Sequence, residues 1–305
     1  MPMDMHGRVG SWEVVEESTV ESAPATEVTE LEYYRPLKVK PIAEGFIAES
    51  SAPTEAATAV DAADGSFNRE AMIYEVVLGE DDRVKVDHAS IRTNPWRQIC
   101  ALRINAATGA HYVGTGWFIA PNVLATAGHC VYMLKEGGWA KSIRIAPGRY
   151  GDDPPPSEWI TATRFASVKG WVHANSRDYD YGVIFLPESE TGRRVGNFSV
   201  RALPDAALKD VRARISGYPA DREQAKFQYY HERPVLGVSE THLDYDHDTY
   251  GGQSGSPIWQ NTEQTGRVAV GIHTNGSTAG NSGTRISQPV LANLIAWIEE
   301  KTSGQ

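Results

Sequence analysis

From residue 95 onward the chain is built of short runs rich in apolar and β-branched residues, separated by Gly, Asn and Pro. Runs of this length between turn residues predict β-strands, and no helical segments alternate with them. The sequence therefore predicts an all-β protein of the barrel or sandwich type. The predicted strands form two groups, 97–104, 111–120, 142–147, 160–168 and 181–187 in the first, and 211–219, 256–259 and 267–276 in the second.

One segment near the end of the chain predicts a helix. Ser287 is a residue type that caps helices, and Pro289 follows within the first turn. Apolar residues then recur every three or four positions, which places them on one helical face. We expect this face to pack on the barrels, through Val290, Leu291, Leu294, Ile295 and Ile298.

The first quarter of the chain has a different character. Residues 1–75 hold 15 acidic and 5 basic residues, which leaves 24 of each for the remainder and accounts for the net charge of −10. Segments rich in Glu, Ser, Thr, Ala and Pro bury too little apolar surface to fold alone. We expect 1–75 to be largely disordered, either as a tail or as a removable pro-segment. No basic patch indicates nucleic acid as a partner.

Three short motifs carry candidate chemistry, and they occur in the order His, Asp, Ser. LATAGHC places His129 just after a predicted strand, DYDYGVIFL places Asp180 directly before an apolar strand, and GGQSGSP is centred on Ser254. A serine hydroxyl becomes a good nucleophile when an imidazole takes its proton and a carboxylate holds that imidazole in the right tautomer. Asp178 competes with Asp180, but we expect Asp178 to be a solvated loop charge.

The spacing around the serine excludes another common hydrolase. An α/β-hydrolase elbow needs Gly two residues after the nucleophile, where this chain has Ser256, and its triad runs Ser, acid, His.

Taken together, the three motifs resemble the trypsin/chymotrypsin-like serine proteases. The resemblance implies two six-stranded antiparallel β-barrels and a catalytic triad of His129, Asp180 and Ser254. It also implies an oxyanion hole made by the N–H groups of Gly252 and Ser254, with no cofactor and no metal.

This resemblance predicts how the chain is divided. We expect a pro-segment at 1–75, an N-terminal barrel at 76–195 with the histidine and the aspartate, and a C-terminal barrel at 196–305 with the serine and the helix. Protein or peptide substrates are the expected partners, without nucleic acid or membrane, and we expect a secreted monomer. The start of the chain, however, shows no secretory signal.

Residues 76–305 are most similar to the bacterial glutamyl endopeptidases, which cleave after Glu. The strings that match include VVLGEDDR, ISGYP, DTYGGQSGSP and HTNG. The resemblance implies that His273 binds the substrate carboxylate and that Thr249 assists it. A carboxylate that enters a partly dry pocket needs charge-assisted donors in place of water, which an imidazole can supply. The alternative is that His273 is an ordinary buried histidine.

Asp248 supports a different specificity. It lies six residues before Ser254, where trypsins carry the acid that selects Arg or Lys. The DTYGG string that contains Asp248 also occurs in the glutamyl branch, and the cysteines that frame a trypsin pocket are absent, so we favour Glu or Asp. A third hypothesis is a catalytically silent relative that binds peptides.

The mature start of the glutamyl branch aligns with Val76, and the preceding residue is Glu75. A Glu-specific enzyme could therefore remove its own acidic arm at this bond. In some relatives, the released α-amine lies near the pocket, so the resemblance makes Val76 a further candidate pocket residue.

The two cysteines leave a question open. Cys130 follows the candidate histidine, where the family has a bridged cysteine, but the usual partner string here reads Gly114-Thr115-Gly116-Trp117. Cys100 could replace that partner, although disulfide geometry is demanding. Asp244, Asp246 and Asp248 alternate but lack the Gly and Glu of a calcium loop, so we predict no metal.

Overall fold

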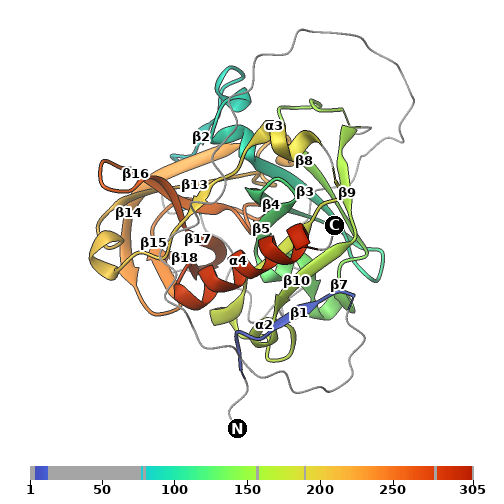
Figure 1. The fold of residues 1–305 in the computed structure, drawn as a ribbon. Helices are drawn as coiled ribbons and strands as arrows, with labels where there is room; N and C mark the ends of the chain where they lie inside the picture. Colours follow the sequence, from blue (N-terminus) through green and yellow to red (C-terminus); the bar gives the residue numbers. More distant parts are fainter. Residues whose placement is uncertain are drawn as a thin grey trace.

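The computed structural model describes residues 4–12, 77, 80–155, 158–188, 190–277 and 280–303. Two β-sheets lie side by side, with the C-terminal helix across the first of them (Figure 1). The two-barrel architecture predicted from the sequence is confirmed. Val76 and Glu75 lie outside the described residues, as does most of the acidic arm.

The first sheet is a curled half-barrel in the order β1-β10-β11-β5-β4-β3-β8-β9, with antiparallel pairing throughout. Its strands point apolar side chains into the core, and Leu102, Ile104 and Phe118 among them are fully or almost fully buried. The strands are β1 (Arg8–Gly10), β3 (Ile99–Asn105), β4 (His111–Ala120), β5 (Val123–Thr126), β8 (Ser142–Pro147), β9 (Ile160–Ala162), β10 (Arg164–Val168) and β11 (Gly182–Phe185).

The second sheet closes into a six-stranded barrel, because β17 pairs with both β16 and β18. β12 adds to β17 in parallel, and β2 adds to the edge of β14. The strands are β2 (Val84–Lys85), β12 (Ser199–Val200), β13 (Arg212–Gly217), β14 (Tyr229–Val238), β15 (His242–Tyr245), β16 (Pro257–Thr262), β17 (Gly266–Ser277) and β18 (Gly280–Arg285).

Short elements join the strands. A two-stranded ribbon and several single turns lie at the ends of the sheets, and none of the helices in the described part of the chain is long and apolar enough to span a bilayer. The short connecting elements are β6 (Tyr132–Met133), β7 (Gly138–Trp139), α1 (Gly128–Val131), α2 (Lys169–Val172), α3 (Glu190–Val195), and the 3-10 turns η2 (Ser90–Arg92), η3 (Trp96–Gln98), η4 (Leu134–Glu136), η6 (Arg177–Tyr179), η7 (Asp205–Ala207) and η8 (Glu223–Ala225).

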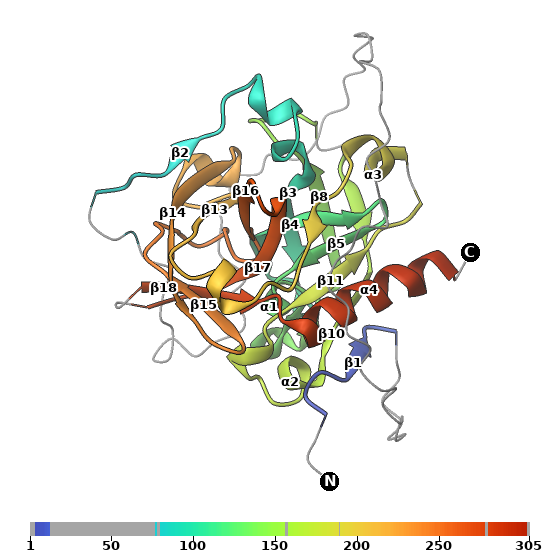
Figure 2. The same ribbon diagram turned by 60° about the vertical axis from the view of Figure 1, so that its left-hand side comes forward.

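The C-terminal helix α4 (Gln288–Ser303) matches the predicted helix. Its buried face carries Val290, Leu291, Leu294, Trp297 and Ile298, which belong to the main hydrophobic core, built largely from the first sheet. The helix contacts β5 and β11, so it covers the N-terminal barrel although it follows the C-terminal one in sequence (Figure 2).

One strand lies within the segment expected to be disordered. β1 occupies Arg8–Gly10 and pairs with β10 at the edge of the first sheet. It lies beside α2 in both ribbon views. The bounds expected for the two barrels also differ at one point, because β2 at Val84–Lys85 belongs to the second sheet.

Candidate active site

His129 and Asp180 are brought together by strand pairing. β5 and β11 are antiparallel with Thr126 opposite Gly182, so the residues just beyond these strand ends also face each other. The Nδ1 atom of His129 lies 2.7 Å from Oδ2 of Asp180, and the backbone N–H of His129 donates to Oδ1 at 2.9 Å. Both side chains are fully buried. The carboxylate therefore fixes both the main chain and the ring of the histidine.

This pairing sets the electrostatics of the imidazole. Burial alone would lower the pKa of His129, but the negative charge of Asp180 outweighs it and raises that pKa well above its usual value. A ring with a raised proton affinity is suited to accept a proton from a neighbouring hydroxyl.

Ser254 lies in a tight loop before β16, and main-chain geometry there requires glycine. Gly252 has a φ of 97°, and a Cβ atom at this position would lie 2.5 Å from the carbonyl oxygen of Tyr218. Only glycine adopts this conformation and approach without strain. The expected oxyanion-hole residues Gly252 and Ser254 are thus both part of this constrained loop.

Thr115 ties the serine loop to the N-terminal barrel. Its backbone N–H donates to the carbonyl of Ser254 at 2.9 Å, and its hydroxyl donates to the carbonyl of Gly252 at 2.8 Å. The thiol of Cys130, the residue after His129, lies 3.6 Å from the carbonyl oxygen of Ser254. The structure therefore brings the three predicted catalytic motifs to one place. In the sequence, Thr115 was named only as part of the string that lacks the usual cysteine.

The predicted pocket histidine is buried behind the same loop. His273 lies on β17, its carbonyl accepts the N–H of Gly255 at 2.7 Å, and its Nδ1 lies 2.6 Å from the hydroxyl of Tyr245 on β15. Thr249, the second predicted pocket residue, is buried in the loop that leads to the serine. A further histidine, His247, lies beside the Tyr245 ring, and burial lowers its pKa to about 4. His247 is therefore neutral and does not charge this region.

A buried arginine links the start of the body to the serine loop. The side chain of Arg83 is 1% exposed and forms ion pairs with Asp81 at 2.7 Å and Asp221. It also donates through Nη1 to Oε1 of Gln253 at 3.4 Å, and the same oxygen accepts the N–H of Tyr250 at 3.1 Å. Burial opposes the charged guanidinium, but its hydrogen bonds to the two carboxylates outweigh this and raise the pKa of Arg83.

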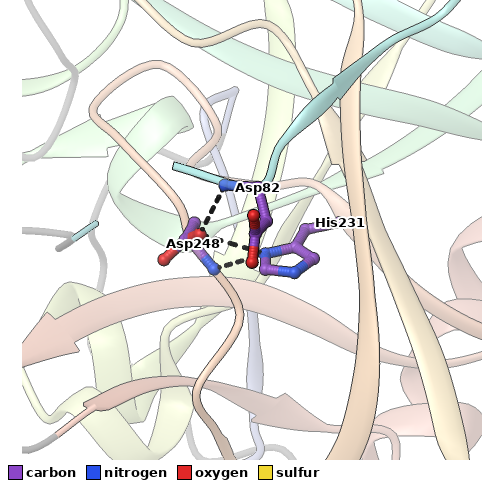
Figure 3. A group of neighbouring side chains, drawn as sticks. All are labelled: Asp82, His231 and Asp248. Carbon is purple, nitrogen blue, oxygen red and sulfur yellow. Dashed lines mark hydrogen bonds and ion pairs between the residues drawn. The ribbon is translucent and has the colours of Figure 1, made fainter. Parts of the chain in front are cut away.

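Asp248, the candidate acidic residue at the bottom of a trypsin-like pocket, is hydrogen-bonded within the protein. Its carboxylate accepts the N–H of Asp82 at 3.1 Å and lies 3.5 Å from Nδ1 of His231, and its own N–H donates to that nitrogen at 2.8 Å (Figure 3). We call Asp82, His231 and Asp248 the aspartate–histidine clasp. It joins the segment before β2 to the loop before the serine, and sequence reasoning had assigned it no role.

The ligand atoms of the clasp lie within 4.8 Å of one another, a spacing found in metal sites. The donor set nevertheless does not suit a cation. Nδ1 of His231 accepts a hydrogen bond from the backbone N–H of Asp248, and Nη2 of Arg233 donates to a carboxylate oxygen of Asp82 at 3.1 Å. A positive guanidinium at this carboxylate repels a second cation.

Both cysteines are free thiols, and both are buried. Cys100 therefore does not replace the missing partner of Cys130, and the two cysteines form no disulfide with each other. A Cβ atom built at Gly114 would lie 2.9 Å from Sγ of Cys130, which is the position that the resemblance implies for the missing partner cysteine.

Known proteins are similar to this chain in sequence and in fold. Residues 114–272 match the family model of the trypsin-like peptidase domain. The chain is 38% identical over 237 residues to a glutamyl endopeptidase of Bacillus licheniformis, across 75% of this chain and 70% of that protein. It is 36% identical over 225 residues to an extracellular metalloprotease of Bacillus subtilis (strain 168), across 73% of this chain and 70% of that protein.

A solved structure of a Glu endopeptidase in complex with MPD has the same fold, with a TM-score of 0.62 at 28% identity, over 72% of this chain and 98% of that one. The chain therefore belongs to the trypsin-like serine proteases, and it is a serine endopeptidase. Within that class it is a member of the glutamyl endopeptidase branch.

Proposed function

We propose that this enzyme cleaves peptide bonds after Glu, and after Asp, with His129, Asp180 and Ser254 as its triad. The observation that carries the proposal is the pairing of His129 with Asp180 at 2.7 Å beside a serine loop tied to the same barrel through Thr115. Relatives named glutamyl endopeptidases support the specificity.

In the proposed mechanism, Oγ of Ser254 attacks the scissile carbonyl and Nε2 of His129 takes its proton. Asp180, bonded to Nδ1, holds the ring in the tautomer whose Nε2 can accept, and stabilises the imidazolium that forms. The N–H groups of Gly252 and Ser254 donate to the developing oxyanion. His129 returns the proton to the leaving amine, and water then releases the acyl group by the same steps.

Specificity for an acidic side chain follows from the tautomer of His273. When the Tyr245 hydroxyl donates to Nδ1 of His273, the hydrogen of the ring is on Nε2, where it can be donated to a substrate carboxylate. An isolated carboxylate is costly to bury, so a directed donor favours Glu over its amide analogue Gln. The hydroxyl of Thr249 would supply a second donor to the substrate carboxylate.

The rival preference for Arg or Lys would need the Asp248 carboxylate to face the substrate. That carboxylate is fully buried and bonded within the clasp, which argues for a structural role. We also propose that the enzyme cuts its own chain after Glu75 during maturation. This cleavage would release 1–75 and place the α-amine of Val76 near the pocket. The name of the Bacillus subtilis relative supports export from the cell.

Matched peptides that differ only in the residue before the scissile bond test the specificity. We expect Glu to be cleaved at least 100-fold faster than Gln, and Lys to be cleaved no faster than Gln. Faster cleavage after Lys would contradict the proposal in favour of Asp248. Terminal sequencing of the active form tests maturation, and full activity with 1–75 still attached would count against it.

A fluorophosphonate probe tests the chemistry separately. We expect it to label Ser254 in the native enzyme and to label nothing in Ser254→Ala, while the exposed serine on β12 provides the control Ser199→Ala. His273→Ala should keep the labelling but lose the preference for Glu over Gln. His173→Ala, at an exposed histidine after α2, should change neither. A silent peptide-binding relative would not label at all.

A further inference from the structure

The far N-terminus is anchored to the body of the protein by backbone hydrogen bonds. β1 pairs antiparallel with β10, with Arg8 opposite Val168 and Gly10 opposite Ala166. The pairing extends at both ends, because Ser11 N–H donates to the carbonyl of Phe165 at 2.9 Å and Lys169 N–H donates to the carbonyl of Gly7 at 2.7 Å. Residues 4–12, which we call the anchor strand, therefore complete the edge of the first sheet.

Side chains reinforce this pairing at its two ends. Nδ1 of His6 lies 2.9 Å from the hydroxyl of Tyr181, and the amide of Asn293 on α4 donates to the carbonyl of His6 at 2.9 Å. At the other end, the Trp12 ring meets the Phe185 ring edge to face at 5.4 Å, and the guanidinium of Arg164 lies 4.4 Å from the Trp12 ring centre. The anchor strand thus contacts β10, β11 and α4.

The anchor strand also lies next to the candidate triad. Tyr181 is the residue directly after Asp180, and its buried hydroxyl is shared between His6 and Asn293. Gly170 N–H on α2 donates to the carbonyl of Met5 at 2.8 Å, and Trp171 on the same helix packs edge to face on the His129 ring at 6.2 Å. The anchor strand therefore supports the half of the site that holds the histidine and the aspartate.

We propose that the anchor strand is a docking element that keeps the released fragment 1–75 bound to the mature enzyme as an edge strand. This inference rests on the proposed cleavage after Glu75. None of the contacts described above involves residues near that bond, so cutting the bond leaves all of these contacts in place. The cut removes the covalent link, which before cleavage supplies a high effective concentration of the anchor strand at the sheet edge. β-strand addition to an exposed sheet edge is an established mode of peptide binding.

The test separates docking from the enzyme's own activity. Ser254→Ala protein is given a recognition site for an unrelated protease within residues 50–60 and is cut with that protease. The nicked protein is then passed through size-exclusion chromatography at tens of micromolar and examined by native mass spectrometry. We expect the N-terminal fragment to remain with the body, whereas its elution as a free peptide would overturn the proposal.

Two matched proline variants test whether strand pairing is responsible. The pairs at Gly7 and Ser11 are hydrogen-bonded, and hydrogen-bonded pairs alternate along an antiparallel ladder. Val9, which lies opposite Ser167, is therefore in a hydrogen-bonded pair and its amide points to β10, whereas the Arg8 amide points away. Val9→Pro should weaken retention about tenfold or more, because proline removes that donor. Arg8→Pro should weaken it much less, and equal retention of both variants would overturn the proposal.

These outcomes are distinct from failure of the proposed function. The cut is made by a foreign protease in a protein without the nucleophile, so fragment retention does not depend on Glu specificity or on self-cleavage. If the native enzyme is instead found to mature at another bond, the same experiment still reports whether the anchor strand holds the fragment on the barrel.

Discussion

The two halves of the candidate site are held in place by different kinds of contact. His129 and Asp180 lie just beyond paired strands of one sheet, and Asp180 bonds both the ring and the main chain of the histidine. The Ser254 loop depends on contacts from distant parts of the chain, namely Thr115 on β4 and Arg83 before β2. The direct contact of the first half therefore joins two of the three catalytic motifs, whereas the serine loop also depends on residues outside those three motifs.

The largest expected effect is in the histidine–aspartate half. Asp180→Asn should lower kcat about 10⁴-fold, because the amide no longer holds His129 in the productive tautomer. Steady-state kinetics on a Glu peptide measure this. Asp178→Asn is the control, since Asp178 is exposed on η6. A loss of similar size in the control would reassign the acid.

The same pair predicts the acid limb of the pH profile. Activity is lost as pH falls through the pKa of His129, because the protonated ring cannot accept from Ser254. Asp180 raises that pKa, so the limb of kcat/KM should lie above the ordinary histidine value of about 6.5. In Asp180→Asn the limb should move to lower pH, and an unchanged limb would contradict this assignment.

A disulfide introduced beside His129 should stabilise that half without speeding catalysis. In a disulfide, Cβ of one cysteine lies about 3 Å from Sγ of the other, which matches the 2.9 Å between a Cβ at Gly114 and the Cys130 thiol. Gly114→Cys should raise the free energy of unfolding by about 3 kcal/mol when oxidised. Chemical denaturation with and without reductant measures this, and equal curves would show that no bridge forms.

The serine half should respond to Arg83. Arg83→Met should lower kcat roughly 10- to 100-fold with a smaller change in KM, because it leaves Asp81 and Asp221 without their buried partner and frees Gln253 beside the nucleophile. Arg83→Lys should recover part of the loss. Arg222→Met is the control, since Arg222 also pairs with Asp81 but is 44% exposed. If the two methionine variants lose activity equally, Arg83 has no special role at the serine.

Specificity should depend more weakly on Tyr245. Tyr245→Phe removes a hydrogen bond to His273 worth about 1 kcal/mol, so kcat/KM for a Glu peptide should fall about 5- to 10-fold. The Gln peptide should be affected less. Tyr250→Phe, at a tyrosine that is 44% exposed, is the control. An equal fall on both peptides would mean that Tyr245 acts on catalysis instead of selection.

The smallest expected effect is that of a chelator. The clasp residues Asp82, His231 and Asp248 already bond to one another and to Arg233, so EDTA should change the rate of peptide hydrolysis less than twofold. A large loss that Ca²⁺ or Zn²⁺ restores would contradict the structural role of the clasp.

The sequence predicted the elements whose apolar pattern is strong. Strands such as β4 and β8 and the face of α4 lie where the pattern placed them, because their inward residues form the core. β14, β15 and β18 were not predicted. β14 contains Pro234 and charged residues, and β18 reads GNSGTR with no apolar side chain. These strands form through pairing with barrel neighbours, which a local pattern does not record.

Site prediction had the same limit. His129, Asp180 and Ser254 are marked by short motifs, and the structure brings those motifs together. Thr115 and Arg83 act through contacts with residues more than a hundred positions away, so nothing beside them in the sequence reports their role. The short string that contains Thr115 was noticed only for its missing cysteine.

The position of α4 has a consequence for how the protein is made. Leu291, Leu294 and Trp297 belong to the core of the first sheet, and Trp297 packs against Tyr181 with ring centres 6.0 Å apart. During synthesis, the N-terminal barrel emerges from the ribosome well before these residues exist. Its hydrophobic interior therefore stays incomplete until α4 has been synthesised, and a truncated polypeptide that lacks α4 would expose apolar surface and be prone to aggregate.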